Sequence, residues 1–433
     1  MPFEMIDMPA RRIAIIGGGI SGLAGAYLMS QRHRVTLFEA EPRLGGHART
    51  VLAGKRGDQP VDTGFIVFNH VNYPNLTALF EKLDVPTAPS NMSFCASFDA
   101  GRYEYGLGSL DQVFATRRAA LDPRHLRMLR DILHFNKNGH RVALDNPGLS
   151  IGGLLEQLGT GTWFRERYIL PFSGAIWSTP TAKILDFPAT AMMEFFRNHA
   201  LLSANGQHQW HTVRGGSIEY VRRLTAYLER AGVNLRSGTP VESVTRAVDG
   251  VQVKAHGAEA ERFDEVIFAT HSDITLRLLA DPTEAERRAL GAVKYQTNDA
   301  VLHCDADFMP KRRKTWSSWA YTERGPEDRA RISLSYWMNS LQPIPQDDPI
   351  FVTLNANHPV REDCIYDTYS FDHPVYDAAA LDAQGAVRAM NGMNRTWFSG
   401  AWLHSGFHED GFKSAVDVAR AMEERTRKLA AVA

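Results

Sequence analysis

The pattern of apolar and polar positions near the N-terminus predicts a strand, a helix and a second strand in close succession. Residues 13–16 form a short apolar run, the pattern of a strand buried on both faces of a parallel sheet. We expect a helix over about 21–31, and residues 35–38 form the next apolar strand. A strand–helix–strand unit of this kind is typical of α/β proteins.

A second group of patterned segments lies in the middle of the chain. Residues 218–231 have a helical pattern, and residues 241–247 and 251–255 flank Asp249-Gly250, which is a signal for a β-hairpin. Residues 263–270 predict one further strand. The sequence therefore predicts an α/β fold whose first strand has partners far along the chain.

Three glycines follow the first predicted strand at the spacing Gly17-x-Gly19-x-x-Gly22. Gly17 permits a tight turn, Gly19 leaves room for a diphosphate, and Gly22 lets the helix pack close to the sheet. The diphosphate of a dinucleotide can then bind free N–H groups at the helix N-terminus. Glu39, at the end of the second strand, can bind an adenosine ribose and would repel the 2′-phosphate of NADP. The alternative is a glycine-rich turn without a ligand, which the flanking strand, helix and acid disfavour.

The next segment reads Arg43-x-Gly45-Gly46-x-x-x-Thr50, and here the chain resembles the flavin-containing amine oxidase and phytoene desaturase superfamily. Residues 61–65, 214–217, 239–241, 398–400 and 406–415 extend the resemblance. It implies FAD as the cofactor, with the last of these segments covering the flavin. The residues assigned to the cofactor are Gly17, Gly19, Ile20, Ser21, Gly22, Glu39, Ala40, Arg43, Gly45, Gly46, Thr63, Gly64, Phe65, Val241, Gly400, Glu409, Asp410 and Gly411.

The resemblance implies an amine-oxidase-like division of the chain into two domains. The FAD motifs fall in three separated blocks, so we expect a discontinuous Rossmann-like FAD-binding domain over 1–80, 205–285 and 388–433. An α+β substrate domain is then expected from 81–204 and 286–387.

Two departures from the family pattern bear on the reaction. Oxygen-reacting amine oxidases carry a lysine near the flavin, but residues 295–301 contain none, and Lys294 is displaced by several positions. The cysteine that binds flavin covalently in monoamine oxidases is missing from residues 396–407. By resemblance, these differences argue against fast use of oxygen and imply noncovalent FAD.

A narrower resemblance rests on residues 61–69, on Ala175-Ile176-Trp177-Ser178-Thr179-Pro180 and on residues 406–411. These segments resemble a bacterial subfamily of predicted NAD/FAD-binding oxidoreductases that are associated with cyclopropane-type fatty acid methyltransferases. That association implies a lipid substrate.

The composition gives little indication of macromolecular partners. The formal net charge of −1 gives no reason to expect nucleic acid. Cys95, Cys304 and Cys364 are far apart and form no metal or paired-thiol motif, so we expect no metal and a reduced, cytoplasmic protein. Residues 1–7 lack the apolar region of a signal peptide, and no run of 18 apolar residues suggests a membrane span.

Two basic segments suggest peripheral contact with the inner face of a membrane. In residues 111–141 seven arginines and lysines alternate with apolar residues, the pattern of a basic amphipathic helix. Residues 311–321 combine Lys311-Arg312-Arg313-Lys314 with Trp316, Trp319 and Tyr321. The alternatives are a helix with a solvated basic face and a loop near core aromatics.

The residues with candidate catalytic roles lie in the segment that resembles the flavin cover. Trp402 and Phe407 could line the substrate site, and His408 could act as acid or base near neutral pH. Other aromatic residues are candidates for the same wall or for the core: Trp177, Phe187, Phe195, Phe196, Trp210, Tyr336 and Trp337.

Three hypotheses about function follow. The first is an FAD-dependent oxidoreductase in which a hydride passes to flavin N5 from an apolar substrate such as a fatty acyl chain, with net desaturation or double-bond isomerisation. The second is a flavin-containing amine oxidase. The third is a flavin-binding protein without turnover.

Overall fold

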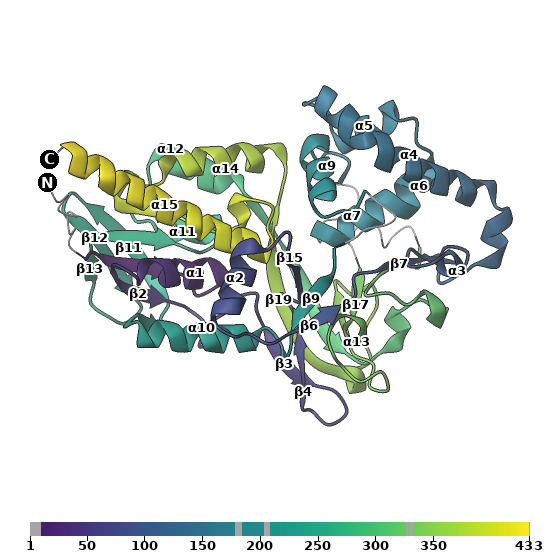
Figure 1. The fold of residues 1–433 in the computed structure, drawn as a ribbon, viewed down its shortest axis with the longest axis horizontal. Helices are drawn as coiled ribbons and strands as arrows, with labels where there is room; N and C mark the ends of the chain where they lie inside the picture. The colour runs from purple at the N-terminus through teal and green to yellow at the C-terminus, as the bar shows by residue number, and fades with distance from the viewer. Residues whose placement is uncertain (1–9, 178–183, 203–207, 326–327, 329–332, 433) are drawn as a thin grey trace, which may run out of the picture.

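The structure is a computed structural model that describes residues 10–177, 184–202, 208–325, 328 and 333–432. Residues 1–7, in which no signal peptide is expected, and the motif residues Ser178-Thr179-Pro180 lie outside these ranges. The ribbon has two parts (Figure 1). The first part is an α/β arrangement around a parallel sheet, the second part contains strands and helices, and long strands connect the two.

A five-stranded parallel sheet forms the centre of the first part. Its strands follow the order β10 (Asn234–Arg236), β2 (Arg34–Phe38), β1 (Arg12–Ile16), β14 (Glu265–Phe268) and β20 (Thr396–Phe398). The strand at the centre, β1, is the first in the chain, and its neighbour β14 is about 250 residues away. The predicted α/β class is therefore confirmed.

The side chains of β1 alternate between two hydrophobic cores, which explains why residues 13–16 are all apolar. Ile13 and Ile15 face the helices α1 (Ile20–Met29), α10 (Ile218–Arg230) and α15 (His408–Val432). Ala14 and Ile16 face the opposite core. That second layer contains β11 (Val241–Ala247), β12 (Gly250–Ala255), β13 (Glu261–Phe263), α11 (Ser272–Leu278), α12 (Glu284–Ala292) and α14 (Ala378–Met390).

The single strand predicted over 263–270 is wrong. The structure has two strands there, β13 and β14, separated at Asp264. Phe263 pairs antiparallel with Val251, whereas Glu265 pairs parallel with Ile13, so the chain changes layer between them. The apolar residues on both sides of Asp264-Glu265 do not reveal such a change.

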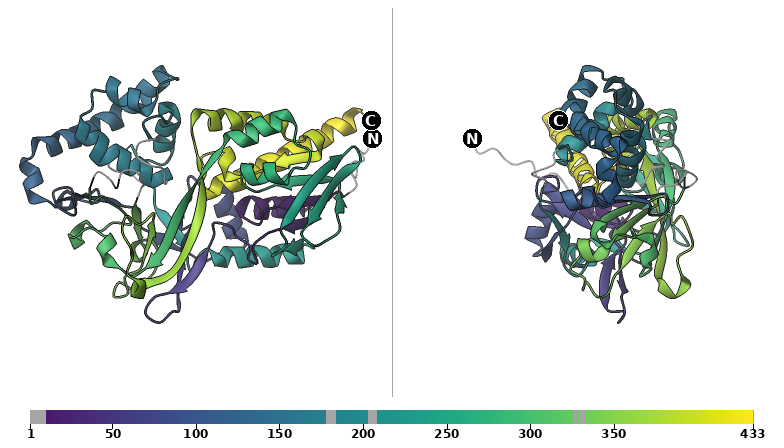
Figure 2. Two further views of the ribbon diagram at one scale, coloured as in Figure 1. Left: turned by 180° about the vertical axis from the view of Figure 1, so that it is seen from behind. Right: turned by 90° about the vertical axis from the view of Figure 1, so that its right-hand side faces the viewer.

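The second part is built on a seven-stranded sheet. The strand order is β19 (Ile365–Val375), β15 (Lys294–His303), β18 (Phe351–Leu354), β17 (Leu334–Trp337), β16 (Trp319–Thr322), β7 (Phe94–Phe98) and β8 (Tyr103–Gly106). The long pair β15 and β19 runs between the two parts of the molecule, as the view from behind shows (Figure 2).

Helices cover the β7, β8 and β16 end of this sheet. They are α4 (Pro123–Asp145), α5 (Ile151–Gln157), α6 (Thr162–Phe164), α7 (Leu170–Trp177) and α9 (Ala189–Asn198). Their apolar faces and the strands share one core, in which Tyr105, Phe135 and Phe164 are fully buried. This mixture of strands and helices agrees with the expected α+β character of the second part.

The predicted basic helix over 111–141 is divided in the structure. The short helix α3 (Leu110–Val113) and a 3₁₀ turn at 117–121 precede α4, which begins only at Pro123. Pro123 occupies the first helical turn, and the Asp122 side chain accepts a hydrogen bond from the Arg124 N–H. None of the helices in the described ranges is long and apolar enough to cross a membrane.

Small sheets and short helices lie where the two parts meet. They are β3 (Thr50–Ala53) with β4 (Gln59–Asp62), β5 (Val67–Asn69) with β9 (Trp210–Val213) and β6 (Thr87–Ser90), and the helices α2 (Pro74–Lys82) and α13 (Met338–Leu341).

The carboxylate of Asp62 connects these elements. It accepts hydrogen bonds from the Thr50 hydroxyl (2.6 Å), from the Ser217 N–H (2.8 Å) and hydroxyl (2.7 Å), and from the Gln342 amide (2.9 Å). Asp62 is fully buried, and burial raises its pKa to about 6 although these donors oppose the rise. One side chain thus links β3, the start of α10 and the end of α13.

We predict that Asp62→Asn lowers the free energy of unfolding by about 2 kcal/mol. The NH₂ group of asparagine replaces one carboxylate oxygen and cannot accept the hydrogen bonds that this oxygen accepts. Denaturant unfolding followed by tryptophan fluorescence measures this change. Asp58→Asn, at an exposed position four residues away, is the control and should be neutral. Equal stability of the two variants would contradict the role given to Asp62.

Candidate active site

The glycine turn after β1 has the geometry that the sequence predicted. Gly17 has φ +108°, and its N–H donates to the Phe38 carbonyl at 2.8 Å. A Cβ on Gly22 would lie 1.8 Å from the Gly17 carbonyl oxygen, so only glycine permits this approach. A Cβ on Gly19 would meet only the Gly46 Cα, at 4.0 Å. The turn is therefore closed toward the sheet and open above Gly19.

The loop of Arg43, Gly45 and Gly46 lies beside that opening. The Gly45 N–H donates to the Gly18 carbonyl at 2.8 Å, and Gly45 forms a parallel bridge with Gly19. The Arg43 guanidinium donates to the Gly46 carbonyl at 2.9 Å and so holds the loop in its turn. Two separate glycine segments thus form one cradle of backbone.

Glu39 lies at the edge of this cradle. Its carboxylate accepts from the Gly18 N–H at 2.5 Å and from the Glu41 N–H at 2.8 Å, one bond to each oxygen. Each oxygen keeps a further lone pair, which ribose hydroxyls can use. The Thr239 N–H donates to the Glu39 carbonyl at 2.8 Å, so the chain toward Val241 passes next to Glu39, as expected for an adenosine site.

The N-termini of α1 and α15 meet at the other end of the cradle. A Cβ on Gly411 would lie 2.6 Å from the Ile20 Cγ2 atom and 2.9 Å from the Ser21 hydroxyl oxygen. The Gly400 N–H donates to the Ser414 hydroxyl at 2.8 Å, which holds the chain before α15 against the helix. Two positive helix ends therefore face the same region, and the first turn of α1, from Ile20 on, has no acidic residue. This arrangement suits an anionic diphosphate.

The carboxylates of Glu409 and Asp410 are already bound by the protein. Glu409 accepts from the Asn75 and Leu76 N–H groups, both at 3.0 Å, and so caps α2. Asp410 accepts from the Phe407 N–H at 2.9 Å, and burial raises its pKa to about 6. Direct contact of these two side chains with a cofactor stays a prediction.

Residues 63–65 pass close to the loop after Gly46. The Thr63 N–H donates to the Arg49 carbonyl and the Phe65 N–H to the His47 carbonyl, both at 2.9 Å. A Cβ on Gly64 would lie 2.1 Å from the His47 oxygen. The segment predicted to lie beside the cofactor ring is thus joined to the segment predicted to lie along the diphosphate.

His408 has a closed environment. Its ring stacks on Phe65 with centroids 3.9 Å apart, and its Nε2 atom lies 2.6 Å from the Tyr220 hydroxyl. Burial lowers the pKa of His408 to about 3, so the ring is neutral. Its role as acid or base stays a prediction, and its contacts favour a positioning role.

The other two candidate catalytic residues face different surroundings. Trp402 is buried in the core behind the parallel sheet and donates its indole N–H to the Thr270 carbonyl at 3.1 Å. Phe407 is half-buried and stacks on Phe195 of α9, with centroids 5.0 Å apart. Phe407 therefore connects the segment before α15 to the helical end of the second part.

Aromatic contacts continue from Phe407 into the second part. Phe195 lies 4.9 Å from Trp177, which stacks at 6.3 Å on Phe196, and Phe196 contacts Phe172. Phe187 joins the same group, whereas Trp337 lies with Trp316 in a smaller cluster. We call this group the aromatic wall; it consists of Phe407, Phe195, Trp177, Phe196 and Phe172. Its side chains are mainly apolar.

A group of three histidines was missed in the sequence. His47, His271 and His373 are half-buried, and the His47 ring lies 5.6 Å from His373 and 6.1 Å from His271. Burial lowers the pKa of His373 to about 4 and also lowers the pKa of His271, and burial together with the neighbouring histidines lowers the pKa of His47. The three rings are therefore neutral at physiological pH. They come from the loop after Gly46, the end of β14 and β19, so no local signal could have grouped them.

The tautomer of His373 follows from its neighbour. The Asn298 amide nitrogen, which can only donate, lies 2.9 Å from His373 Nδ1. The proton of the neutral ring is therefore on Nε2. Among the described residues, no three acidic, histidine or cysteine side chains form a group that could hold a metal ion.

Lys294, the only lysine near the position expected in oxygen-reacting amine oxidases, points away from this group. It is exposed, and its ammonium donates to the Gly291 carbonyl at the end of α12, at 2.6 Å. Asn298 of the same strand is fully buried and bonds to His373 and Asn355.

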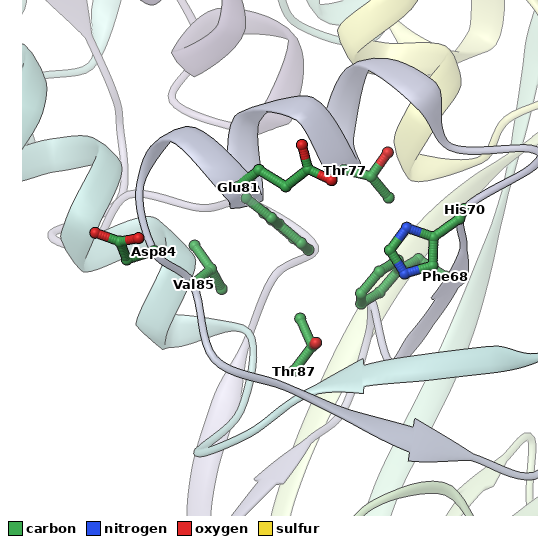
Figure 3. Close-up of a pocket in the computed structure, with 8 residues that line it drawn as sticks. Phe68, His70, Thr77, Glu81, Asp84, Val85 and Thr87 are labelled. Atoms are coloured by element: carbon green, nitrogen blue, oxygen red, sulfur yellow. The ribbon is translucent and has the colours of Figure 1, made fainter.

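A separate cavity of about 340 Å³ lies between α2 and the β5–β6 region (Figure 3). Phe68 and His70 line one side, and Thr77 and Glu81 of α2 line another. It contains none of the residues predicted to bind the cofactor.

The open glycine cradle, the two converging helix ends and the aromatic residues of the second part suit an oxidoreductase whose cofactor carries phosphate. Residues 20–348 match the family model described as flavin containing amine oxidoreductase. The chain belongs to this family, as the sequence motifs predicted.

Individual relatives are more distant. The carotenoid phi-ring synthase of Streptomyces griseus is 27% identical over 336 residues, which are 71% of this chain and 60% of that protein. The chain thus matches less than two thirds of that relative's length.

Solved structures share the fold. The CLA-producing fatty acid isomerase from P. acnes superposes with a TM-score of 0.68 and 16% identity, over 95% of this chain and 98% of that one. Putrescine oxidase bound to putrescine gives a TM-score of 0.67 and 16% identity, over 96% and 99%. The predicted amine-oxidase-like fold is therefore confirmed.

We predict that Gly22→Ala abolishes flavin retention, because the new methyl group would collide with the Gly17 carbonyl and displace the cradle. Flavin absorbance per mole of purified protein measures the effect. Gly25→Ala, one turn later in α1, is the matched control, since its Cβ would make an ordinary contact at 3.5 Å with Ile15. Full flavin content in Gly22→Ala would refute the location of the cradle.

A pH prediction follows from His373. Its pKa falls from 6.5 to about 4 on folding, so the unfolded chain takes up a proton between these values and the folded protein does not. The stability due to this ring is fully present above pH 6.5 and is lost as pH falls to 4. The free energy of unfolding of the wild type should therefore fall between pH 6.5 and pH 4. In His373→Asn this fall should be smaller than in the wild type, by up to about 3 kcal/mol.

Denaturant unfolding of the flavin-free protein at a series of pH values tests this. His256→Asn, which alters a largely exposed ring, should follow the wild-type profile. Parallel profiles for His373→Asn and wild type would show that the ring is not kept neutral by the fold.

Proposed function

We propose that the protein binds FAD noncovalently and uses it to remove a hydride from an apolar substrate, either a fatty acyl chain or another lipid. Support for FAD comes from Glu39 at the ribose end of the cradle and from the Arg43–Gly46 loop beside it. Support for noncovalent binding comes from the absence of cysteine in residues 396–407. Bound FAD would supply the two-electron acceptor.

The aromatic wall is the observation that carries the proposal of an apolar substrate. It starts at Phe407, in the segment that resembles the flavin cover, and continues through Phe195 and Trp177. Trp177, Phe195 and Phe196 are buried in the core of the second part, and Phe407 is half-buried at its edge. An apolar environment of this kind suits an acyl chain, whereas a charged amine would lose its hydration there. The fold shared with a fatty acid isomerase and the sequence match to a carotenoid phi-ring synthase are compatible with an apolar substrate.

The neutral histidines can handle the second proton of such a reaction. The His373 ring lies 5.6 Å from His47, and the Asn298 amide holds its Nδ1 atom at 2.9 Å. A neutral ring can donate or accept a proton without a permanent buried charge. If the same hydride returns to the substrate, the result is isomerisation; if it passes to another acceptor, the result is a new double bond.

Amine oxidation is the second candidate, because putrescine oxidase has the same fold. The orientation of Lys294 disfavours it, since the ammonium is bound to Gly291 and points away from the histidines.

Anaerobic reduction of the flavin tests the proposal. We expect flavin absorbance to bleach with unsaturated fatty acids or phospholipids and to stay unchanged with putrescine and other primary amines. In Phe195→Ala, bleaching by lipid should slow by about tenfold or more, because the wall loses a ring and its packing. Phe114→Ala, a half-buried aromatic outside the wall, is the control.

Product analysis separates the outcomes. Shifted double bonds without consumption of an acceptor indicate isomerisation, and a net gain of double bonds indicates desaturation. Rapid formation of hydrogen peroxide from amines would overturn the lipid proposal. A bound flavin that neither lipids, amines nor porphyrins reduce would instead support a flavin-binding protein without turnover.

A further inference from the structure

Exposed leucines gather at the helical end of the second part. Eleven large apolar side chains are exposed among the described residues, and six of them lie within residues 107–144. Leu121 is 88% exposed, Leu110 is 78% exposed and Leu133 is 65% exposed. Single exposed leucines need no explanation, but such a concentration in one segment marks an interaction surface.

The outer face of α4 alternates leucine with cations. Leu126, Arg130, Leu133, Lys137, Arg141 and Leu144 follow one another at spacings of three or four residues, so they share one helix face, and all six are exposed. The opposite face supplies the core, where Met128, Phe135 and Ala143 are fully buried. These leucines are thus not needed for packing within the protein.

The second basic segment lies beside the first. The Gln112 amide donates to the Lys314 carbonyl at 2.9 Å, and the Lys314 ammonium lies 3.3 Å from Asp111. Lys311, Arg313 and Lys314 are exposed there. The structure therefore brings residues 311–314 next to the exposed Leu110, although about 200 residues separate the two segments.

We propose that this arginine–leucine surface, the exposed residues of 107–144 and 311–314, docks on an anionic lipid membrane. Its cations are Arg117, Arg118, Arg124, Arg127, Arg130, Lys137, Arg141, Lys311, Arg313 and Lys314, and the acids on or beside it are Asp111, the partly exposed Asp122 and Asp145, with Asp131 buried beneath. The whole chain has a net charge of −1, so this excess of positive charge is local. Cations next to leucines complement anionic headgroups above acyl chains.

The leucines favour lipid over nucleic acid. Leucine neither binds phosphate nor stacks on bases, and it gains free energy only when an apolar phase removes it from water. The surface does not depend on the proposed activity, because it would bind membranes whatever substrate the flavin site accepts.

Sedimentation with vesicles tests the surface on the flavin-loaded protein. We expect the wild type to bind vesicles of phosphatidylglycerol and phosphatidylcholine, to bind pure phosphatidylcholine weakly, and to dissociate as salt rises. Arg130→Gln with Lys137→Gln should weaken partitioning about 25-fold. Leu126→Gln with Leu133→Gln should weaken it about tenfold or more without loss of helix, since glutamine favours helices.

Matched controls carry the same changes elsewhere. Leu52→Gln with Val248→Gln and Arg222→Gln with Arg427→Gln alter exposed residues outside the surface and should bind as the wild type does. Circular dichroism and flavin content show whether each variant is folded. The proposal is overturned if the wild type ignores anionic vesicles, or if the controls lose binding as much as the surface variants. Binding to polyuridylic acid that the leucine variants retain, without vesicle binding, would also overturn it.

Discussion

The hydrogen bonds of the buried Asp62 carboxylate are the constraint on which the candidate site depends. Thr50 follows the loop that shapes the cradle, Ser217 begins α10 and Gln342 belongs to the second part, and all three bind the same two oxygens. Because an unpaired carboxylate cannot stay buried, these segments must come together or the site does not form. Asp62 immediately precedes Thr63-Gly64-Phe65, so the same bonds also fix the residues predicted to lie beside the ring of the cofactor.

The charges of the site are arranged in two zones. Helix N-termini and backbone N–H groups face the region predicted to hold the diphosphate, and the Glu409 and Asp410 carboxylates, which would oppose an anion, are bound by other N–H groups. Farther along, neutral histidines and aromatic rings replace charges. The end of the site at the helix N-termini thus suits the charged part of a ligand. The end with histidines and aromatic rings suits a redox reaction on an apolar molecule.

The sequence predicts the parts of this structure that are set by neighbouring residues. The helix expected over 21–31 is observed at Ile20–Met29, and the hairpin over 241–255 has the predicted strands, because local glycines and apolar runs determine both. The strand over 263–270 and the helix over 111–141 were wrong in extent, since a change of layer at Asp264 and a helix start at Pro123 interrupt continuous patterns. The histidine group depends on three distant segments, and the contact between Cys304 and Cys364, whose backbones share a hydrogen bond of 3.0 Å, depends on two.

The position of β20 in the parallel sheet has a consequence for how the chain folds during synthesis. The edge strand and the start of α15 come from residues 396–411, yet they pack against β14, about 130 residues earlier, and α1, about 390 residues earlier. The cradle therefore stays incomplete until residues 396–411 have left the ribosome, and the loop-closure entropy of these long-range contacts is paid late in folding. Until then the β14 edge of the sheet is unpaired and open to aggregation, so early cofactor binding cannot protect the nascent protein.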